Sequence, residues 1–268
     1  MTNPALNDKR FEGEVDEWKA GYAAPGGGTA TLDRGDQAPP TTHGAVMTAN
    51  GTFAKTFVLF LVVLAGAAFG WQQTSVSPTD QIEIPGWVWL SVFVGFGLAM
   101  VCIFKPKASP FLAPLYALAE GVFLGAISKA FELRWDGIVL QAVLATVGVF
   151  FATLALYVFG VVKVTKKFQA VVIGATLGIF VMYLLGFVLS LFGVDMVFWN
   201  NPTPFGIIFS VVICVVASLN LFLDYEFIRQ ASVAGAPKYM EWYGAFGIMV
   251  TLVWLYLEIL RLLSLLRR

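Results

Sequence analysis

The chain has 268 residues, of which 58% are hydrophobic and only 13% are charged, and its mean hydropathy is +0.78. A soluble domain carries roughly 25% charged residues, so the composition indicates a polytopic membrane protein. The formal net charge is zero, which excludes a global basic field that would attract nucleic acid. The single histidine, His43, lies in a polar stretch. Histidine-based zinc sites and a serine–histidine triad within the membrane are therefore excluded.

Residues 1–50 differ in composition from everything that follows. The stretch 24–44, APGGGTATLDRGDQAPPTTHG, is rich in Gly, Pro and Thr and has almost no large apolar residues. Such a segment cannot bury enough surface to offset its chain entropy. We predict a disordered cytoplasmic tail over residues 1–50 and a transmembrane domain over residues 51–268.

A membrane-spanning helix needs about 20 apolar residues, and seven segments of the chain qualify. They are residues 56–71, 86–104, 111–131, 137–162, 168–194, 205–224 and 243–266. The connections between them are short and contain proline, glycine and asparagine, which are typical of turns. Short connections favour antiparallel neighbours. We therefore predict an all-α fold, a polytopic membrane bundle of seven transmembrane helices.

The distribution of basic residues predicts the orientation. One set of connections carries Lys55, Lys105, Lys107, Lys163, Lys166, Lys167, Arg229 and Lys238. The alternate connections are mostly acidic, so we expect a multi-pass protein of the cytoplasmic membrane with its N-terminus in the cytoplasm. Seven spans then place the C-terminus outside, which disagrees with the basic residues Arg267 and Arg268. A last segment that re-enters the membrane instead of spanning it would resolve this disagreement.

Three segments carry glycines four residues apart. The pairs are Gly66 with Gly70, Gly121 with Gly125, and Gly174 with Gly178. Small residues at this spacing let membrane helices approach closely, so each pair is a candidate helix contact.

The stretch NLFLDYEFI, residues 220–228, places an aspartate at the end of an apolar segment. An ionisable side chain at membrane depth is costly and needs a partner, a water-filled cavity or an ion. Asn220 lies one helical turn before Asp224 and hence on the same face, so the two could offer oxygen ligands along one helix wall. Alternatively, Asp224 only caps the helix end near the headgroups, just before the first exposed charges, Glu226 and Arg229.

Two further groups of ionisable residues lie within the predicted spans. Glu120 is near the middle of the segment 111–131, where it is either a protonated structural carboxyl or part of an ion or proton path. Glu258 and Arg261 are three residues apart and hence on one helix face. They form either a local ion pair near the outer interface or a gate that faces Glu120 across the bundle.

Motifs of soluble enzymes are missing from the sequence. It contains no GxxxxGK[ST], HExxH or GxSxG pattern. An intramembrane aspartyl hydrolase would need two aspartates that share a proton, and Asp224 has no second aspartate at comparable depth in the predicted spans. We therefore expect a protein that is not an enzyme and needs no cofactor.

Three stretches resemble the Bax inhibitor family, the YccA-like proteins with a transmembrane Bax-inhibitor motif. They are YALAEGVFLGAIS at residues 116–128, NLFLDYEFI at 220–228 and LYLEILRLLSLL at 255–266. The resemblance covers roughly residues 51–268. The long tail and the phrase APKYMEWYGAFG, residues 236–247, resemble an actinobacterial-type branch of that family.

This resemblance implies six helices around a central hydrophobic seventh. It also implies a pH-sensitive calcium leak set by two aspartates that share a proton near the cytoplasmic end. Asp224 matches the first aspartate, but Thr251 stands at the position of the second. The basic partner of the first aspartate, which would latch the closed state, corresponds to Lys105 or Lys107.

The favoured function is therefore a slow flux of cations, calcium or protons, along a polar path that involves Asp224, Asn220 and Glu120. Calcium takes six to eight oxygen ligands, and the spans offer few carboxylates, so weak binding is expected rather than a tight metal site. The alternative is a non-conducting regulator that binds other membrane proteins, such as a membrane protease. The lipid bilayer is the expected surroundings in either case.

Overall fold

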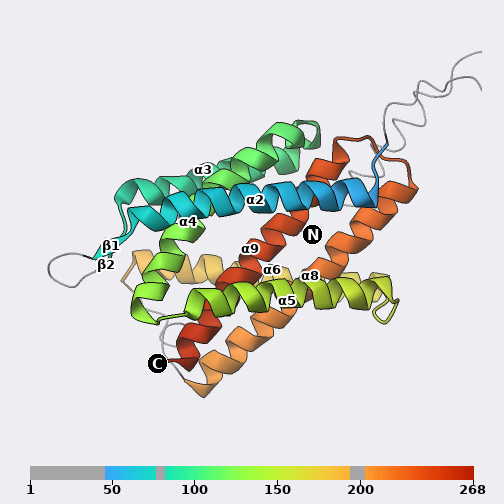
Figure 1. Cartoon of the computed structure of the whole chain (residues 1–268). Coiled ribbons are helices and arrows are strands. Elements are labelled where there is room, and N and C mark those ends of the chain that lie inside the picture. Colours follow the sequence, from blue (N-terminus) through green and yellow to red (C-terminus); the bar gives the residue numbers. More distant parts are fainter. Residues whose placement is uncertain (1–45, 77–81, 194–202) are drawn as a thin grey trace, which may run out of the picture.

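The computed structural model describes residues 46–76, 82–193 and 203–268 (Figure 1). In this part of the chain, seven helices are long and apolar enough to cross a membrane. They are α2 (Ala49–Gln73), α3 (Gly86–Phe104), α4 (Ser109–Arg134), α5 (Ile138–Val158), α6 (Lys166–Leu191), α8 (Pro204–Val233) and α9 (Met240–Leu266). The short 3-10 helix η1 (Pro106–Ala108) joins α3 to α4, and strands β1 (Ser75–Val76) and β2 (Ile82–Glu83) pair antiparallel between α2 and α3. The prediction of an all-α, seven-helix membrane bundle is confirmed.

Helix α8 is longer than its apolar stretch. The sequence predicts an end at Asp224, whereas the helix continues to Val233. Polar side chains in the added turns bond one another, because Glu226 accepts hydrogen bonds from Arg229 and Gln230, three and four residues later. Pairs at these spacings stabilise a helix, so it continues past the apolar run. Gly235, with φ of 72°, then turns the chain toward α9.

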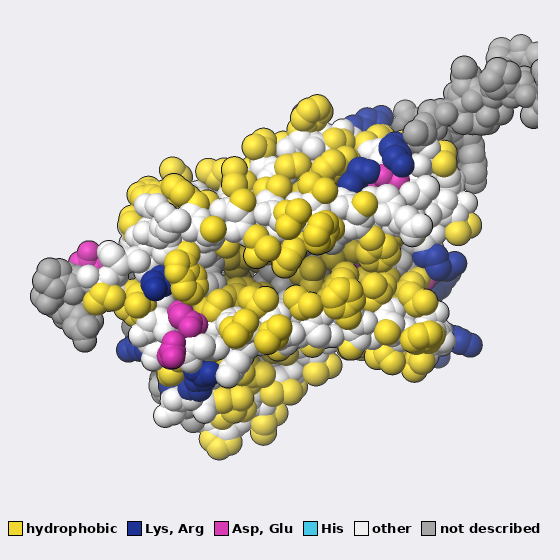
Figure 2. All heavy atoms as spheres, in the orientation of Figure 1, with side chains coloured by type: hydrophobic (Ala, Val, Ile, Leu, Met, Phe, Trp, Pro, Cys, Tyr) yellow, Lys and Arg dark blue, Asp and Glu magenta, His cyan; other side chains and the backbone are white. Residues whose placement is uncertain are grey.

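The helices alternate in direction between two ends of the bundle. At one end, which we call the basic end, the start of α2 meets the α8–α9 connection through a hydrogen bond from Met47 N to Ala236 O of 2.7 Å. The start of α4 is there as well, because the hydroxyl of Ser109 donates to the carbonyl of Tyr239. The eight basic residues that the sequence places on one side of the membrane lie at this end, either in its connections or in the adjoining helix turns: Lys55, Lys105, Lys107, Lys163, Lys166, Lys167, Arg229 and Lys238. Figure 2 shows hydrophobic side chains over the middle of the molecule and charged ones toward its ends.

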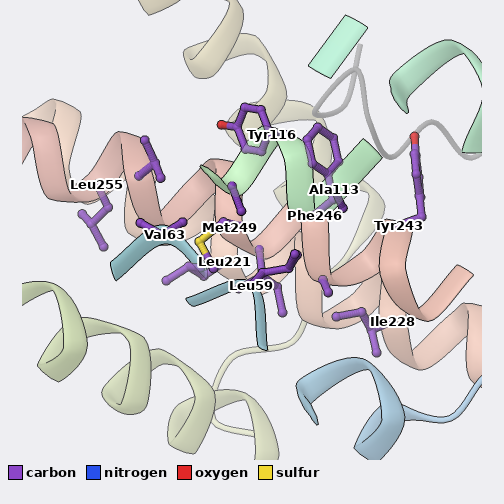
Figure 3. Close-up of a cluster of buried hydrophobic side chains, with 14 of the residues drawn as sticks. Leu59, Val63, Ala113, Tyr116, Leu221, Ile228, Tyr243, Phe246, Met249 and Leu255 are labelled. Carbon is purple, nitrogen blue, oxygen red and sulfur yellow. The ribbon is translucent and has the colours of Figure 1, made fainter. Parts of the chain in front are cut away.

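Helix α9 runs through the centre of the bundle. It packs against α2, α4, α5 and α8 and has the largest buried share of the seven helices (Figure 1). Its apolar side chains meet those of its neighbours in one core, shown in Figure 3 with Leu59 and Val63 of α2, Ala113 and Tyr116 of α4, Leu221 and Ile228 of α8, and Tyr243, Phe246, Met249 and Leu255 of α9. The expectation of a hydrophobic central seventh helix is confirmed.

The last helix crosses the whole bundle. It begins at the basic end, and at its far end Arg267 donates to the backbone carbonyl of Asp136, in the α4–α5 connection, at 2.7 Å. The neighbouring Arg268 lies over the ring of Trp135 in the same connection. A re-entrant segment would return to the end at which it began, so that alternative is wrong. The two terminal arginines are instead held by the connection beside them.

Two of the three glycine pairs form a close helix contact. A methyl group on Gly66 of α2 would lie 2.6 Å from the carbonyl oxygen of Leu118, and one on Gly121 of α4 would overlap the carbonyl of Val63. Gly70 and Gly125 have equally close backbone neighbours on the opposite helix. Around Gly174 and Gly178, by contrast, the structure shows open space. The glycine spacing therefore predicted the α2–α4 contact but not a contact of α6.

The packed domain begins before the predicted boundary at residue 51. Val46 bridges to Pro237, Met47 is buried, and α2 starts at Ala49. Residues 46–50 therefore belong to the bundle. Residues 1–45, which form most of the predicted disordered tail, lie outside the described residues, so that part stays a prediction.

Candidate functional site

A buried carboxylate and a hydroxyl join α8 to the central helix. Asp224 is 1% exposed and Thr251 is 4% exposed. The Thr251 hydroxyl donates to Asp224 Oδ2 at 2.6 Å. The same hydroxyl lies 3.2 Å from the carbonyl oxygen of Gly247, one turn earlier on α9. Thr251 therefore has two acceptors within reach, one of which is the carboxylate.

Asp224 lies inside α8, well before the helix end at Val233. The interpretation of Asp224 as a residue that caps the helix end is therefore wrong. Glu226, expected to be the first exposed charge, is 8% exposed. Both errors have one cause, because α8 does not end where its apolar run ends.

Asn220 is buried one turn before Asp224, as the spacing predicted, but it contacts another helix. Its amide donates to the Thr176 hydroxyl of α6 and to the backbone carbonyl of Val216, both at 2.8 Å. Asn220 thus ties α6 to α8, while Asp224 ties α8 to α9. Together with Thr176 and Thr251, they form a group of polar side chains across three helices at membrane depth.

Glu120 and the Glu258–Arg261 pair lie against different helices. Glu120, half-buried on α4, has its Oε2 3.1 Å from the position of a methyl group on Gly95 of α3. Glu258 accepts a hydrogen bond from the Tyr183 hydroxyl of α6 and lies 3.4 Å from Arg261 Nη1. The local ion pair is therefore present and extends to α6. A gate that joins it to Glu120 stays a prediction.

Lys105 and Lys107, the two expected latch residues, are exposed. Lys105 follows the last residue of α3, and Lys107 lies in η1. The hydrogen bond described for the Asp224 carboxylate comes instead from Thr251. The lysine latch stays a prediction. Thr251, which stands where the resemblance implies a second aspartate, itself bonds Asp224.

Another buried carboxylate, at the basic end, was not predicted from the sequence. Glu241, in the first turn of α9, is 0% exposed. It pairs with Lys55 of α2 and with Lys238 at 2.8 Å, and it accepts hydrogen bonds from the backbone and the hydroxyl of Thr48. The three-residue spacing of Lys238 and Glu241 is visible in the sequence. The contacts with Thr48 and Lys55, which join the first helix to the last, carry no local signal.

The described residues form no group of three or more His, Cys, Asp or Glu side chains able to hold a metal ion. A calcium ion takes six to eight oxygen ligands. The buried carboxylates of the described bundle are instead separate from one another, and their partners include hydroxyl groups and basic side chains.

Seven apolar helices, four of which pack directly against the central α9, have polar side chains buried between them and define a multi-span helical membrane protein. The family model described as Bax inhibitor 1 like matches residues 3–268, and the chain belongs to this family. Comparisons with curated proteins and with solved structures found no match. The family prediction is thus confirmed, while the YccA-like and actinobacterial-type assignments stay predictions.

Proposed function

We propose that this protein permits a slow, pH-dependent flux of cations across the cytoplasmic membrane, controlled at the contact of Asp224 with Thr251. The observation that carries the proposal is a carboxylate buried between α8 and the central helix, with a hydroxyl as its hydrogen-bond donor. Ionisable residues within membrane spans are rare and mark ion or proton paths. Protons or calcium are the cations proposed. The basic end faces the cytoplasm, because basic connections favour that side.

The geometry suggests how acid would act. At neutral pH the ionised carboxylate accepts the Thr251 hydroxyl, and this bond holds α8 against α9. Acidification protonates Asp224 and removes the charge that strengthens the bond. The Thr251 hydroxyl can then turn to the Gly247 carbonyl, which is already within 3.2 Å. Release of the contact therefore leaves the Thr251 hydroxyl with an acceptor, which lowers the energetic cost of release.

The test is flux against pH in proteoliposomes that contain the full chain. Asp224→Asn is neutral at every pH and should behave as the wild type does in acid, with a raised flux at neutral pH and a flattened pH response. Asp136→Asn makes the same chemical change at an exposed position in the α4–α5 connection and serves as the control. Its flux should follow the wild type.

Equal flux and equal pH response in wild type and Asp224→Asn would refute the control role of Asp224. If the correctly inserted wild type and both variants conducted no cation at any pH, the conducting function itself would be wrong. A non-conducting regulator of other membrane proteins would then be the better proposal.

A further inference from the structure

A partly open cavity of about 480 Å³ lies at the basic end, between the end of α5 and the last turns of α8. Its size is within the range of small-molecule sites, about 300–1,000 Å³. Val158, Val162 and Val164 line it, together with the cations Lys163 and Arg229. One cavity thus combines apolar side chains with two positive charges.

The remaining lining residues fix Arg229 in place. Glu226 accepts hydrogen bonds from Arg229 Nε at 3.0 Å and Nη2 at 2.6 Å, and from the Tyr157 hydroxyl at 2.7 Å. The Glu226 side chain is 11% exposed, whereas that of Arg229 is 58% exposed. Arg229 bonds Glu226 through Nε and Nη2. A guanidinium has five N–H donors, so Arg229 Nη1 can donate a hydrogen bond to a ligand. Because Lys163 adds a positive charge to the Arg229–Glu226 pair, the lining residues together carry a net positive charge.

The cavity lies where the apolar surface meets the basic end. Val158, Phe159 and Val161, at the end of α5 and just beyond it, are 70%, 81% and 67% exposed, as expected of side chains that face lipid tails. Lys163 follows two residues after Val161. A phospholipid reaching this cavity would meet valines with its chains and cations with its headgroup.

We propose that this cavity binds the headgroup of an anionic phospholipid, with its phosphate contacted by Arg229 and Lys163. A cationic ligand is disfavoured because the one carboxylate, Glu226, is already paired with Arg229. The planar guanidinium matches the geometry of phosphate oxygens, and the lysine adds a point charge. This site is separate from the Asp224–Thr251 contact and does not depend on the proposed flux.

The test uses the full chain in dodecyl maltoside micelles, titrated with dihexanoyl phosphatidylglycerol or dihexanoyl phosphatidylcholine. Native mass spectrometry reports the lipid retained by the protein. We expect saturable retention of phosphatidylglycerol and little retention of phosphatidylcholine. Lys163→Gln should weaken phosphatidylglycerol binding about fivefold, the contribution typical of one cation near a lipid headgroup.

Lys167→Gln is the matched control, because Lys167 is an exposed lysine near the same end but does not line the cavity. It should bind phosphatidylglycerol as the wild type does. Arg229→Lys keeps the charge but loses the planar fork, so it should also weaken binding. Equal retention of the two lipids, or equal loss in the two lysine variants, would overturn the proposal. Displacement of phosphatidylglycerol by inorganic phosphate at equal concentration would assign the cavity to free phosphate and overturn the lipid assignment.

Discussion

Replacing Thr251 by valine tests the central contact most directly. Valine keeps the branched shape of threonine but removes the hydroxyl that donates to Asp224 Oδ2 at 2.6 Å. Both side chains are buried, so water does not readily replace the lost donor. A hydrogen bond to a charged group contributes about 1.5–3 kcal/mol. We expect Thr251→Val to lower the free energy of unfolding by that amount and to raise flux at neutral pH.

A double-mutant cycle separates this bond from general packing effects. In the Asp224→Asn background the acceptor is neutral, and a neutral hydrogen bond contributes about 0.5–1.5 kcal/mol. The two substitutions should therefore show a coupling of about 1 kcal/mol. The assay is reversible unfolding in mixed micelles of dodecyl maltoside and increasing dodecyl sulfate, followed by circular dichroism.

Thr56→Val is the control for this cycle. Thr56 is also a buried threonine, but its hydroxyl donates to the carbonyl of Thr52 within the same helix. Its loss should be smaller and uncoupled from Asp224. Equal losses at positions 56 and 251, with no coupling to Asp224→Asn, would refute an ionised Asp224 held by Thr251.

Three other predictions concern packing, pH and orientation. Gly121→Ala should lower the free energy of unfolding by about 1–3 kcal/mol, because overpacking displaces backbone. Gly174 faces open space, so Gly174→Ala should leave the free energy of unfolding unchanged. Thermal unfolding of both variants in detergent compares them. Thr251→Asp should move the pH response of flux in proteoliposomes toward neutral, because two adjacent carboxylates titrate as a coupled pair; an unchanged pH profile would contradict this. In a variant without the two native cysteines, an impermeant thiol reagent should label Asp136→Cys from outside intact cells but label Lys107→Cys only after permeabilisation, and the reverse pattern would invert the orientation.

Local sequence signals predicted the helices well and their ends poorly. The apolar run from residue 205 located α8, but the run stops at Asp224 while the helix continues to Val233. The added turns hold because Glu226 bonds Arg229 and Gln230 along the helix and Tyr157 of α5 across it. A hydropathy pattern measures transfer into lipid and does not register polar side chains that satisfy one another.

For a similar reason, the sequence pointed to Asp224 as part of the candidate site but not to its hydrogen-bond donor. Asp224 is conspicuous because a charge in an apolar segment demands a partner. Its partner was expected at Lys105 or Lys107, because the resemblance to the Bax inhibitor family implies a basic partner there. The structure supplies a hydroxyl, Thr251, which stands out in no pattern of charge or periodicity.

The sequence by itself determined that this is a membrane protein with seven spans and that α2 and α4 each carry a glycine-lined face. These properties follow from composition and from spacings within a single helix, which physical chemistry constrains locally. Only the tertiary structure decided that Asp224 meets Thr251, 27 residues away, and that Thr48 meets Glu241, 193 residues away. Such contacts depend on which helices become neighbours, and that choice is made by packing around α9 as a whole rather than by any one segment.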